Sequence, residues 1–398
     1  MKLITFLGTR EYDEVTYRWG GKEHTTNLFP EALAHWLQPQ EMLVALTAEA
    51  RASANWAELQ RRLAGKVSLN ALDIPTGRSE QELWEIFDVL TARFGPGDEI
   101  AFDITHAFRS LPVLSLLAAA YLQAAKGVRL CHLLYGCYEA RQDGRAPVFD
   151  LTPFLELLQW LAAADLFQHS GDARRLAPLV KQAHRRPWSS GLATQEDLPR
   201  HLESVAACLD ALSRALLLAR PRDVAPAAQG LAQRLSQVER EASLWARPFA
   251  VLLAAVSATY APFGRDTLAM QRDLVQWFVE RGHVFQAVTL AREWLVSWTC
   301  LHLGKDCITQ REDVERVLNV AVRPTRDPES FAQEVEALKR LPGGEKACAA
   351  WSAVADLRND IAHCGFRKSP RSMSAIARDA AKLPQRLQDL PLPEEPAQ

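Results

Sequence analysis

The sequence predicts an α/β domain at the N-terminus followed by a region made only of helices. Two observations carry this prediction. In the first 153 residues, short apolar runs typical of buried strands alternate with segments whose apolar residues recur at helical spacing. From residue 154 onward the strand pattern disappears, and segments rich in Leu, Ala and Arg are separated by Pro and Gly. We expect a sheet domain over residues 1–153, a helical connecting region over 154–280 and a helical C-terminal domain over 281–398.

The N-terminal elements follow one another as expected for a mainly parallel sheet. Apolar runs without polar alternation indicate strands buried on both faces, because helices cover both sides of such a sheet. Gly20-Gly21 separates two of the strands as a hairpin turn. The predicted strands are Lys2–Leu7, Val15–Trp19, Glu23–Asn27, Met42–Leu46, Val67–Ile74, Glu99–Ile104, Val128–Tyr135 and Val148–Leu151. The predicted helices are Pro30–Leu37, Asn55–Leu63, a segment that Ser79 and Glu82 begin as a capping box, and Leu111–Ala125.

Two of the strand ends carry residues suited to an anionic ligand. Ligands of parallel sheets bind beyond the carboxyl ends of the strands. Gly8-Thr9-Arg10 follows the first strand, where a glycine lets the backbone approach a phosphate. A second loop joins a strand to the N-terminus of a buried helix, which also favours an anion, and it contains Asp103, Thr105, His106, Arg109 and Ser110. The plain alternative is that Gly8 only ends a strand and that Thr105 and Ser110 only cap.

Charge and composition limit the possible partners. The 398-residue chain has a formal net charge of −2, so any contact with nucleic acid must be local. No apolar run is long enough to cross a bilayer and no export signal precedes the first strand, so we expect a cytoplasmic protein without a membrane partner. The seven Cys are scattered without a C-x-x-C pair, which favours reduced thiols and no metal site or cofactor.

The C-terminal region places Arg358 and His363 five residues apart on a predicted helix, Glu345–His363. Arg binds phosphate and His moves protons near neutral pH, which are the roles that RNA cleavage without a metal requires. One such pair is expected by chance in a chain with ten His and abundant Arg, so the pair alone is weak support. The structural alternative is a helix-terminal His and an Arg in an ion pair with Asp356 or Asp360.

The spacing of this pair suggests that two chains build the site. Five residues correspond to roughly 140° around a helix axis, so the two side chains diverge on a lone straight helix. They converge if the Arg side chain wraps around the helix or if two copies meet about a two-fold axis. Asn359 lies four residues before His363 on the same face, and Gly365 can end the helix. The cations that follow are candidates for holding an RNA backbone: Arg367, Lys368 and Arg371.

Taken together, these motifs resemble the CRISPR-associated ribonucleases of type III systems, which join a Rossmann-like CARF domain to a C-terminal HEPN domain. The specific motifs are the loop from Asp103 to Pro112 and the run Arg358-Asn359-Asp360-Ile361-Ala362-His363-Cys364-Gly365. Phe6-Leu7-Gly8-Thr9 and residues 282–294 support the resemblance, whereas residues 155–280 contain no matching motif. Ala107 stands where many members have Gly.

The resemblance implies a ligand, a substrate and a mechanism. The CARF domain would bind a cyclic oligoadenylate, with the tetra-adenylate favoured, across the two-fold axis of a homodimer. Its ligand residues would be Gly8, Thr9, Arg10, Thr105, His106 and Arg109. Binding would activate a HEPN site for single-stranded RNA, built from Arg358, Asn359 and His363 of both chains. His363 would act as general acid or base and Arg358 would stabilise the phosphoryl charge, with no metal and a 2′,3′-cyclic phosphate product.

Other functions remain open at this stage. The same sensor could drive a DNA-binding or adaptor regulator without RNase activity, although the most basic candidate helix, Arg174–Arg186, is interrupted by Pro178. The sensor domain could also cleave the cyclic oligoadenylate slowly through His106 or Arg109. Glu293, on the apolar helix predicted over Val284–Leu303, is a weaker candidate for a partner of the catalytic pair.

Overall fold

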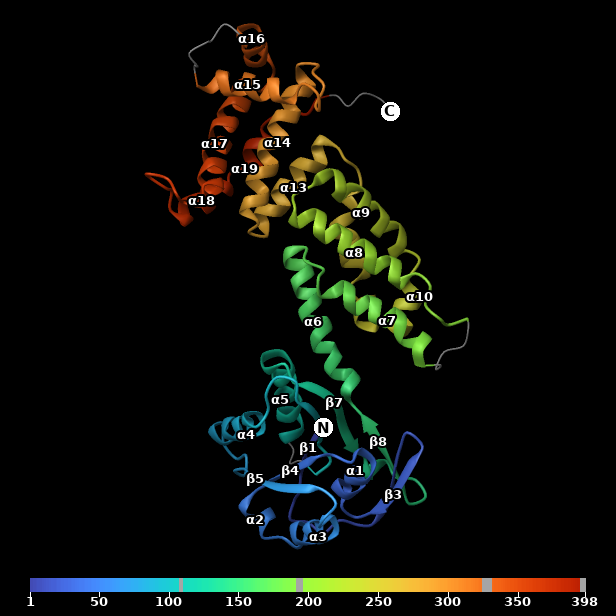
Figure 1. The fold of residues 1–398 in the computed structure, drawn as a ribbon. Coiled ribbons are helices and arrows are strands. Elements are labelled where there is room, and N and C mark those ends of the chain that lie inside the picture. Colours follow the sequence, from blue (N-terminus) through green and yellow to red (C-terminus); the bar gives the residue numbers. More distant parts are fainter. Residues whose placement is uncertain (107–109, 191–195, 324–330, 394–398) are drawn as a thin grey trace. The chain divides into compact units, whose positions relative to one another are not determined.

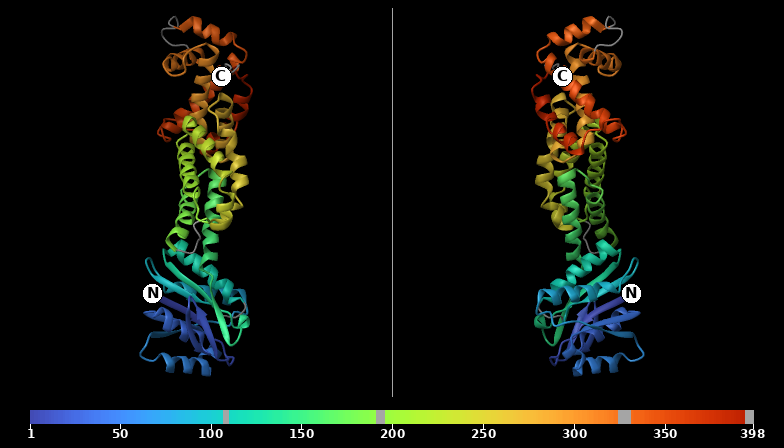
Figure 2. Two further views of the ribbon diagram at one scale, coloured as in Figure 1. Left: turned by 90° about the vertical axis from the view of Figure 1, so that its right-hand side faces the viewer. Right: turned by 90° about the vertical axis from the view of Figure 1, so that its left-hand side faces the viewer.

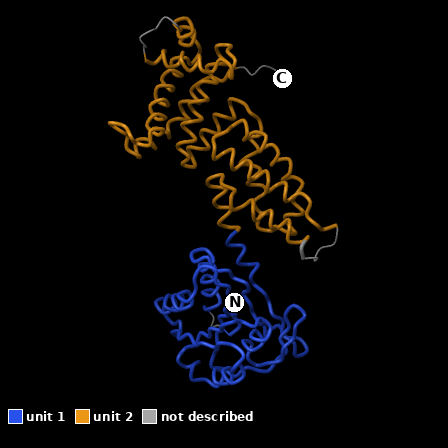
Figure 3. The backbone as a smooth tube through the Cα atoms, in the orientation of Figure 1, with its two compact units in different colours: residues 1–159 blue, residues 160–398 orange. Residues whose placement is uncertain are grey.

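The chain divides into two compact units, Met1–Gln159 and Trp160–Gln398, each described here by itself (Figure 3). The computed structural model describes residues 1–106, 110–190, 196–323 and 331–393. The predicted division of the helical half at residue 280 has no counterpart in these two units and remains a prediction. Within the described ranges, no helix is long and apolar enough to cross a membrane.

The first unit is built on one eight-stranded sheet with the order β3-β2-β8-β7-β6-β1-β4-β5 (Figure 1). The five strands from β7 to β5 run parallel to one another, as the continuous apolar runs predicted. The hairpin at Gly20-Gly21 extends the sheet through β8, which runs antiparallel to β7. The strands are β1 (Lys2–Phe6), β2 (Val15–Trp19), β3 (Lys22–Thr26), β4 (Glu41–Leu46), β5 (Ser68–Asp73), β6 (Glu99–Asp103), β7 (Arg129–Gly136) and β8 (Arg145–Asp150).

Helices cover both faces of the parallel strands. Successive residues of a strand point to opposite faces, so Leu3 of β1 joins the core beneath α1, α2 and α3, while Ile4 joins the core beneath α4 and α5. Both residues are fully buried. The helices are α1 (Phe29–Leu37), α2 (Ala48–Arg51), α3 (Ala54–Leu63), α4 (Glu80–Ala92) and α5 (Leu111–Lys126), of which the four-residue α2 was not predicted.

The start of α4 forms only part of the predicted capping box. The Ser79 hydroxyl accepts the N–H of Glu82 at 3.2 Å, as predicted. The Glu82 carboxylate does not return to Ser79; it accepts the N–H of Arg78 and the hydroxyl of Thr76, both at 3.0 Å. In a reciprocal capping box the Glu82 carboxylate would accept the N–H of Ser79, whereas here it accepts the N–H of the preceding residue, Arg78.

The second unit contains only helices in its described residues. They include α14 (Val284–His302) and α17 (Gly344–Ala362), which match the two long helices predicted there. The others are α7 (Leu176–Ser190), α8 (Leu202–Leu217), α9 (Pro221–Leu235), α10 (Glu239–Trp245), α11 (Arg247–Ala250), α12 (Leu253–Tyr260), α13 (Leu268–Glu280), α15 (Arg311–Val322), α16 (Ala332–Arg340), α18 (Met373–Ala380) and α19 (Leu383–Gln388). The helix α6 (Thr152–Ser170) begins in the first unit and ends in the second.

One hydrophobic core runs through the second unit and fixes α17 against α14. Neighbouring helices pack side by side, α7 on α8, α8 on α9, α13 on α14 and α14 on α17. The rotated views show this helical unit from two further sides (Figure 2). Trp294 and Trp298 of α14 and Trp351 and Leu357 of α17 are fully or almost fully buried in this core. Because one face of α17 is buried in this way, the opposite face presents Arg358 to solvent.

Candidate functional site

The strand order reverses beside β1. The chain passes from β1 to β4 and β5 on one side, then crosses to β6 and β7 on the other. In parallel α/β sheets, such a reversal leaves a crevice at the carboxyl ends of the two central strands. The loop after β1 carries Gly8, Thr9 and Arg10, and the loop after β6 carries Thr105 and His106. The structure therefore brings both predicted ligand loops to the same edge of the sheet.

A buried carboxylate fixes the loop after β6. Asp103 is fully buried, and its carboxylate accepts the Thr5 hydroxyl at 2.6 Å and the N–H of Thr105 at 2.9 Å. Burial raises the pKa of Asp103 to about 6, even though these hydrogen bonds act in the opposite direction. Since Thr5 belongs to β1, this carboxylate joins β1 to β6 across the reversal.

Thr105 and His106 are both engaged within the protein. The Thr105 hydroxyl accepts the N–H of Gly136 at 2.8 Å. The His106 ring stacks on Tyr12 with the centroids 3.9 Å apart and the planes 24° from parallel. Burial lowers the pKa of His106 to about 4, so its ring is neutral at pH 7. Its Nε2 atom is buried and has no hydrogen-bond partner among the described residues.

Two residues that the sequence patterns did not single out shape the loop after β1. The Tyr12 hydroxyl accepts the N–H of Gly8 at 2.8 Å. The side-chain amide of Asn55, in the first turn of α3, donates to the carbonyls of Gly8 at 2.9 Å and of Arg10 at 2.7 Å. Thr9 and Arg10 remain exposed between these anchors. Asn55 is far from the loop in sequence, so no local pattern could have revealed it.

Two predictions about the second loop have different outcomes. Arg109 lies outside the described residues. Ser110 occupies the N-cap position of α5 but makes no capping bond, so the alternative in which Ser110 only caps this helix is wrong. Its backbone, with φ −83° and ψ −25°, is already helical, whereas a capping serine needs an extended backbone. Pro112 lies in the first turn of α5, as predicted.

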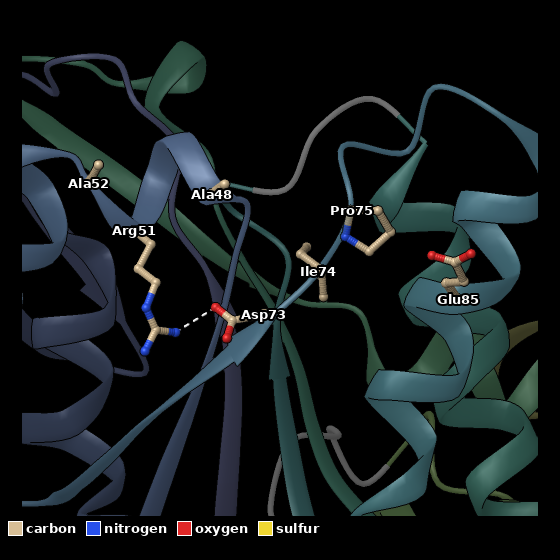
Figure 4. A pocket seen from close by; sticks show the side chains of 7 residues that line it. All are labelled: Ala48, Arg51, Ala52, Asp73, Ile74, Pro75 and Glu85. Atoms are coloured by element: carbon tan, nitrogen blue, oxygen red, sulfur yellow. Dashed lines mark hydrogen bonds and ion pairs between the residues drawn. The ribbon is translucent and has the colours of Figure 1, made fainter.

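A cavity of about 600 Å³ opens at the carboxyl ends of β4 and β5 (Figure 4). Arg51 and Asp73 form an ion pair of 2.5 Å on one side of it, and Glu85 of α4 lies on the other. Its remaining lining residues are apolar: Ala48, Ala52, Ile74 and Pro75. Two carboxylates against one guanidinium do not favour a polyanion, so this cavity is not a good candidate for a phosphate site.

Arg358 is free of the ion pairs that the structural alternative required. It is exposed, and no described residue forms an ion pair or hydrogen bond with its side chain. The carboxylate of Asp356 pairs with Arg323 at 2.5 Å. The buried carboxylate of Asp360 accepts the backbone N–H of Arg371 at 3.0 Å. Because both carboxylates bond elsewhere, the expectation that one of them neutralises Arg358 is wrong.

His363 is the C-cap residue of α17 and is exposed. Its backbone N–H donates to the carbonyl of Asn359 at 3.2 Å, but in the described part of the chain no side-chain bond joins it to Asn359 or Arg358. The first left-handed residue after the helix is Cys364, with φ 51°, and Gly365 follows with φ 77°. The left-handed stop therefore falls one residue before the predicted Gly365.

The three predicted RNA-binding cations are not equivalent. Arg367 contacts Asp360 at 3.5 Å and Arg371 pairs with Asp379 at 2.8 Å. Lys368 is exposed and has no ion pair with a described residue. Lys368 is thus the cation of this loop with the most freedom to meet a phosphate.

Glu293 does not support the catalytic pair as expected. Its carboxylate pairs with Arg292 at 2.6 Å and with Arg311 at 2.7 Å. Arg311 begins α15, so Glu293 fastens α15 to α14 and does not reach Arg358.

Comparisons with known proteins extend over the sheet unit and the helices that follow it. Residues 2–136 match the family model described as the CARF domain of the CRISPR system endoribonuclease Csx1. The N-terminal unit is a CARF domain. Residues 156–262 match the second domain of the CRISPR-associated protein MJ1674. The protein of that name from Methanocaldococcus jannaschii is 34% identical over 112 residues, which is 27% of this chain and 18% of the relative.

The chain thus spans less than a fifth of the length of the curated relative that it matches. Both ligand loops, after β1 and after β6, fall inside the matched CARF domain. Neither matched region extends to α17. The comparisons therefore bear on the domain that contains these loops, whereas a function of the helix with Arg358 and His363 rests on the residues of that helix alone.

Proposed function

We propose that this protein is a metal-independent endoribonuclease of type III CRISPR defence, which cleaves single-stranded RNA when a cyclic oligoadenylate binds its CARF domain. One observation carries the proposal: a CARF domain shares a chain with a helix on which Arg358 and His363 are both exposed. Neither side chain is engaged with a described residue. We assign residues 281–398 to the HEPN class on the Arg-Asn-x3-His motif of Arg358, Asn359 and His363.

The proposed chemistry is transesterification within the RNA. The 2′-OH attacks the adjacent phosphorus, the bond to the 5′ oxygen breaks, and a 2′,3′-cyclic phosphate and a 5′-OH remain. His363 takes the proton of the 2′-OH or supplies one to the leaving oxygen. Arg358 stabilises the charge that builds on the phosphoryl oxygens, and Asn359 orients the phosphate or the imidazole. The nucleophile belongs to the substrate, so the reaction needs no metal.

The loop after α17 suits a single-stranded substrate. Phe366 is 91% exposed, and its backbone N–H donates to the carbonyl of His363 at 2.8 Å. An exposed aromatic ring can stack on an unpaired base, whereas a duplex hides its base faces. Lys368 and Arg358 supply the local positive charge that the chain as a whole lacks.

Two chains would complete both sites. On α17 the residues Arg358 and His363 make no contact with each other, as their roughly 140° separation requires. In the CARF domain, α5 carries an apolar stripe at four-residue spacing, with Val113 63%, Leu117 51% and Tyr121 45% exposed. A stripe of this kind on a monomer's surface commonly marks an interface, and a two-fold contact is self-complementary.

The activator would lie at the reversal beside β1. Backbone N–H groups near Gly8 and the guanidinium of Arg10 can meet its phosphates, and we keep Arg109 as a second cation. We favour the cyclic tetra-adenylate, whose ring can share a two-fold axis with a homodimer.

The decisive variant is His363→Ala. In EDTA with cyclic tetra-adenylate added, the unaltered protein should cleave single-stranded RNA. Under the same conditions His363→Ala should lower kcat by about 10²- to 10⁴-fold, with the affinity for cyclic tetra-adenylate unchanged. His169→Ala is the matched control, because His169 is also exposed near a helix end. Full activity of His363→Ala would remove it from the mechanism. Duplex DNA binding without RNA cleavage would favour a regulator instead.

A further inference from the structure

We propose that Tyr12 occupies, with its own side chain, the place beside β1 that a nucleotide takes, so that the activator must displace Tyr12 to bind. This inference rests on the proposed function, because the displacing ligand is the proposed cyclic oligoadenylate. It makes Tyr12 the residue that sets the threshold of activation. Three contacts carry it.

The first contact takes the place of a phosphate. The Tyr12 hydroxyl accepts the N–H of Gly8 at 2.8 Å. Backbone N–H groups in such glycine loops are the donors that bind phosphate oxygens. Burial raises the pKa of Tyr12, so the hydroxyl is neutral and bonds as a neutral acceptor. A Cβ at Gly8 would lie 3.0 Å from this oxygen, so a side chain there would crowd the contact.

The second contact takes the place of a base. The Tyr12 ring stacks on His106 at 3.9 Å and 24°, which is a stacked geometry that a purine can also adopt. The neighbouring Nε2 atom of His106 is buried and lacks a hydrogen-bond partner among the described residues. A buried polar atom without a partner is uncommon in folded proteins. Departure of Tyr12 would uncover both a ring face and a polar atom.

The third contact shows how Tyr12 can leave while the loop stays in place. Asn55 holds the carbonyls of Gly8 and Arg10, independently of Tyr12. Residues 7–14, which include Tyr12, form neither helix nor strand. A swing of Tyr12 therefore breaks one hydrogen bond, one stacking contact and the packing of its ring against the core beneath α1, α2 and α3, while Asn55 keeps the loop near its position.

When Tyr12 competes for the site, the apparent affinity for the activator equals the intrinsic affinity multiplied by the fraction of molecules in which the site is open. Tyr12→Phe removes the competing hydroxyl and keeps the ring. It should tighten the binding of cyclic tetra-adenylate by about two- to tenfold, the usual worth of one neutral hydrogen bond. The activator concentration for half-maximal cleavage should fall by the same factor, and the maximal rate should not change.

Tyr138→Phe is the matched control. The Tyr138 hydroxyl donates a hydrogen bond of 2.5 Å to Asp13 in the 7–14 segment, and Tyr138→Phe removes it. The hydrogen bond from the N–H of Gly8 to Tyr12 is unaffected by this substitution. Its affinity for the activator should equal that of the unaltered protein. Titration calorimetry on the full-length chain with cyclic tetra-adenylate compares the three proteins.

The outcomes separate the two proposals. Weaker binding by Tyr12→Phe would mean that the hydroxyl contacts the ligand, and it would overturn the inference. Equal binding by the unaltered protein and Tyr12→Phe would overturn it as well, and so would equal tightening in Tyr138→Phe. If the unaltered protein binds neither the cyclic tetra-adenylate nor the cyclic hexa-adenylate, the proposed function fails and the inference fails with it.

Discussion

Asp103 and His106, three residues apart at the end of β6, respond to pH in opposite directions. Burial raises the pKa of Asp103 to about 6 and lowers the pKa of His106 to about 4. Both groups are therefore held toward their uncharged forms. The acid costs stability when it ionises with rising pH, and the imidazole costs stability when it is protonated with falling pH. Each effect can be isolated by replacing one residue.

Asp103→Asn should remove a fall in stability with rising pH. The folded pKa of Asp103 lies above the ordinary value, so its contribution is fully present below about pH 4 and is lost as the pH rises through about 6. Relative to the variant, the unaltered protein should lose roughly 3 kcal/mol of unfolding free energy between about pH 4 and 7. Urea unfolding across this range measures the difference. A difference that stays constant with pH would contradict the buried acid.

Phe366→Ala should weaken the use of RNA without weakening the response to activator. Loss of one stacked base contact costs about 1–3 kcal/mol, so KM for a short single-stranded RNA should rise about tenfold. Met373→Ala is the control, because Met373 is 88% exposed in the following helix. Equal effects of the two variants would show that Phe366 does not contact RNA in particular.

The helix α17 and the loop that follows it behave as one element. Trp351 is buried and its indole N–H donates to the side-chain carbonyl of Asn319 on α15 at 3.1 Å. At the other end, the buried Asp360 accepts the backbone N–H of Arg371. Asp360 therefore holds the loop beyond His363 against the helix and positions the cations of that loop, Arg367 and Arg371.

Asp360→Ala should loosen this loop. The N–H of Arg371 would lose its acceptor, which costs about 1–3 kcal/mol of stability when the group stays buried. RNA cleavage should fall several-fold while activator affinity stays the same. Asp356→Ala is the comparison, since it removes only a surface ion pair with Arg323, worth about 0–1 kcal/mol. Thermal unfolding and cleavage rates would contradict the role of Asp360 if both variants behaved alike.

Elements with a regular pattern were predicted closely, whereas contacts between distant segments were not. The apolar runs located β1, β4 and β6 to within about a residue, because burial on both faces leaves a continuous apolar signature. The position of the β2–β3 hairpin beyond β8 depends on pairing between distant strands and leaves no local pattern. Tyr12 and Asn55 were not predicted for the same reason: each contacts the backbone of Gly8 only in the folded protein, and no local sequence pattern indicates these contacts.

At the scale of the whole molecule, the proposed function joins a sensor to a cleavage site that two chains would complete. The CARF domain places the two predicted ligand loops beside one strand reversal, and a two-fold partner would supply two more. At the proposed cleavage site, Arg358 and His363 are five residues apart and roughly 140° apart around the helix axis, so a second chain would again be needed to bring an Arg and a His together. The proposed function therefore predicts that sensing and cleavage both require a dimer.

Mixing two inactive variants tests whether the cleavage site spans two chains. Arg358→Ala and His363→Ala should each be inactive alone. When the two are unfolded together and refolded, mixed dimers keep one Arg from one chain and one His from the other. Half of the dimers are then mixed, and each mixed dimer keeps one of its two Arg–His pairs. Partial recovery, up to about a quarter of the unaltered rate, is therefore expected if these residues act across the interface. Absence of recovery, with mixed dimers shown by mass spectrometry, would place the working pair within one chain.

In the proposed function, a cyclic oligoadenylate turns on metal-independent RNA cleavage. The most direct measurement of this activation is the cleavage of labelled single-stranded RNA in EDTA, without ligand and with the cyclic tetra- or hexa-adenylate added separately. Rapid cleavage with one ring, preferably the tetra-adenylate, and little without ligand is the predicted result. Cleavage that is equal with and without both rings, or that appears only when a divalent metal is restored, would contradict the account.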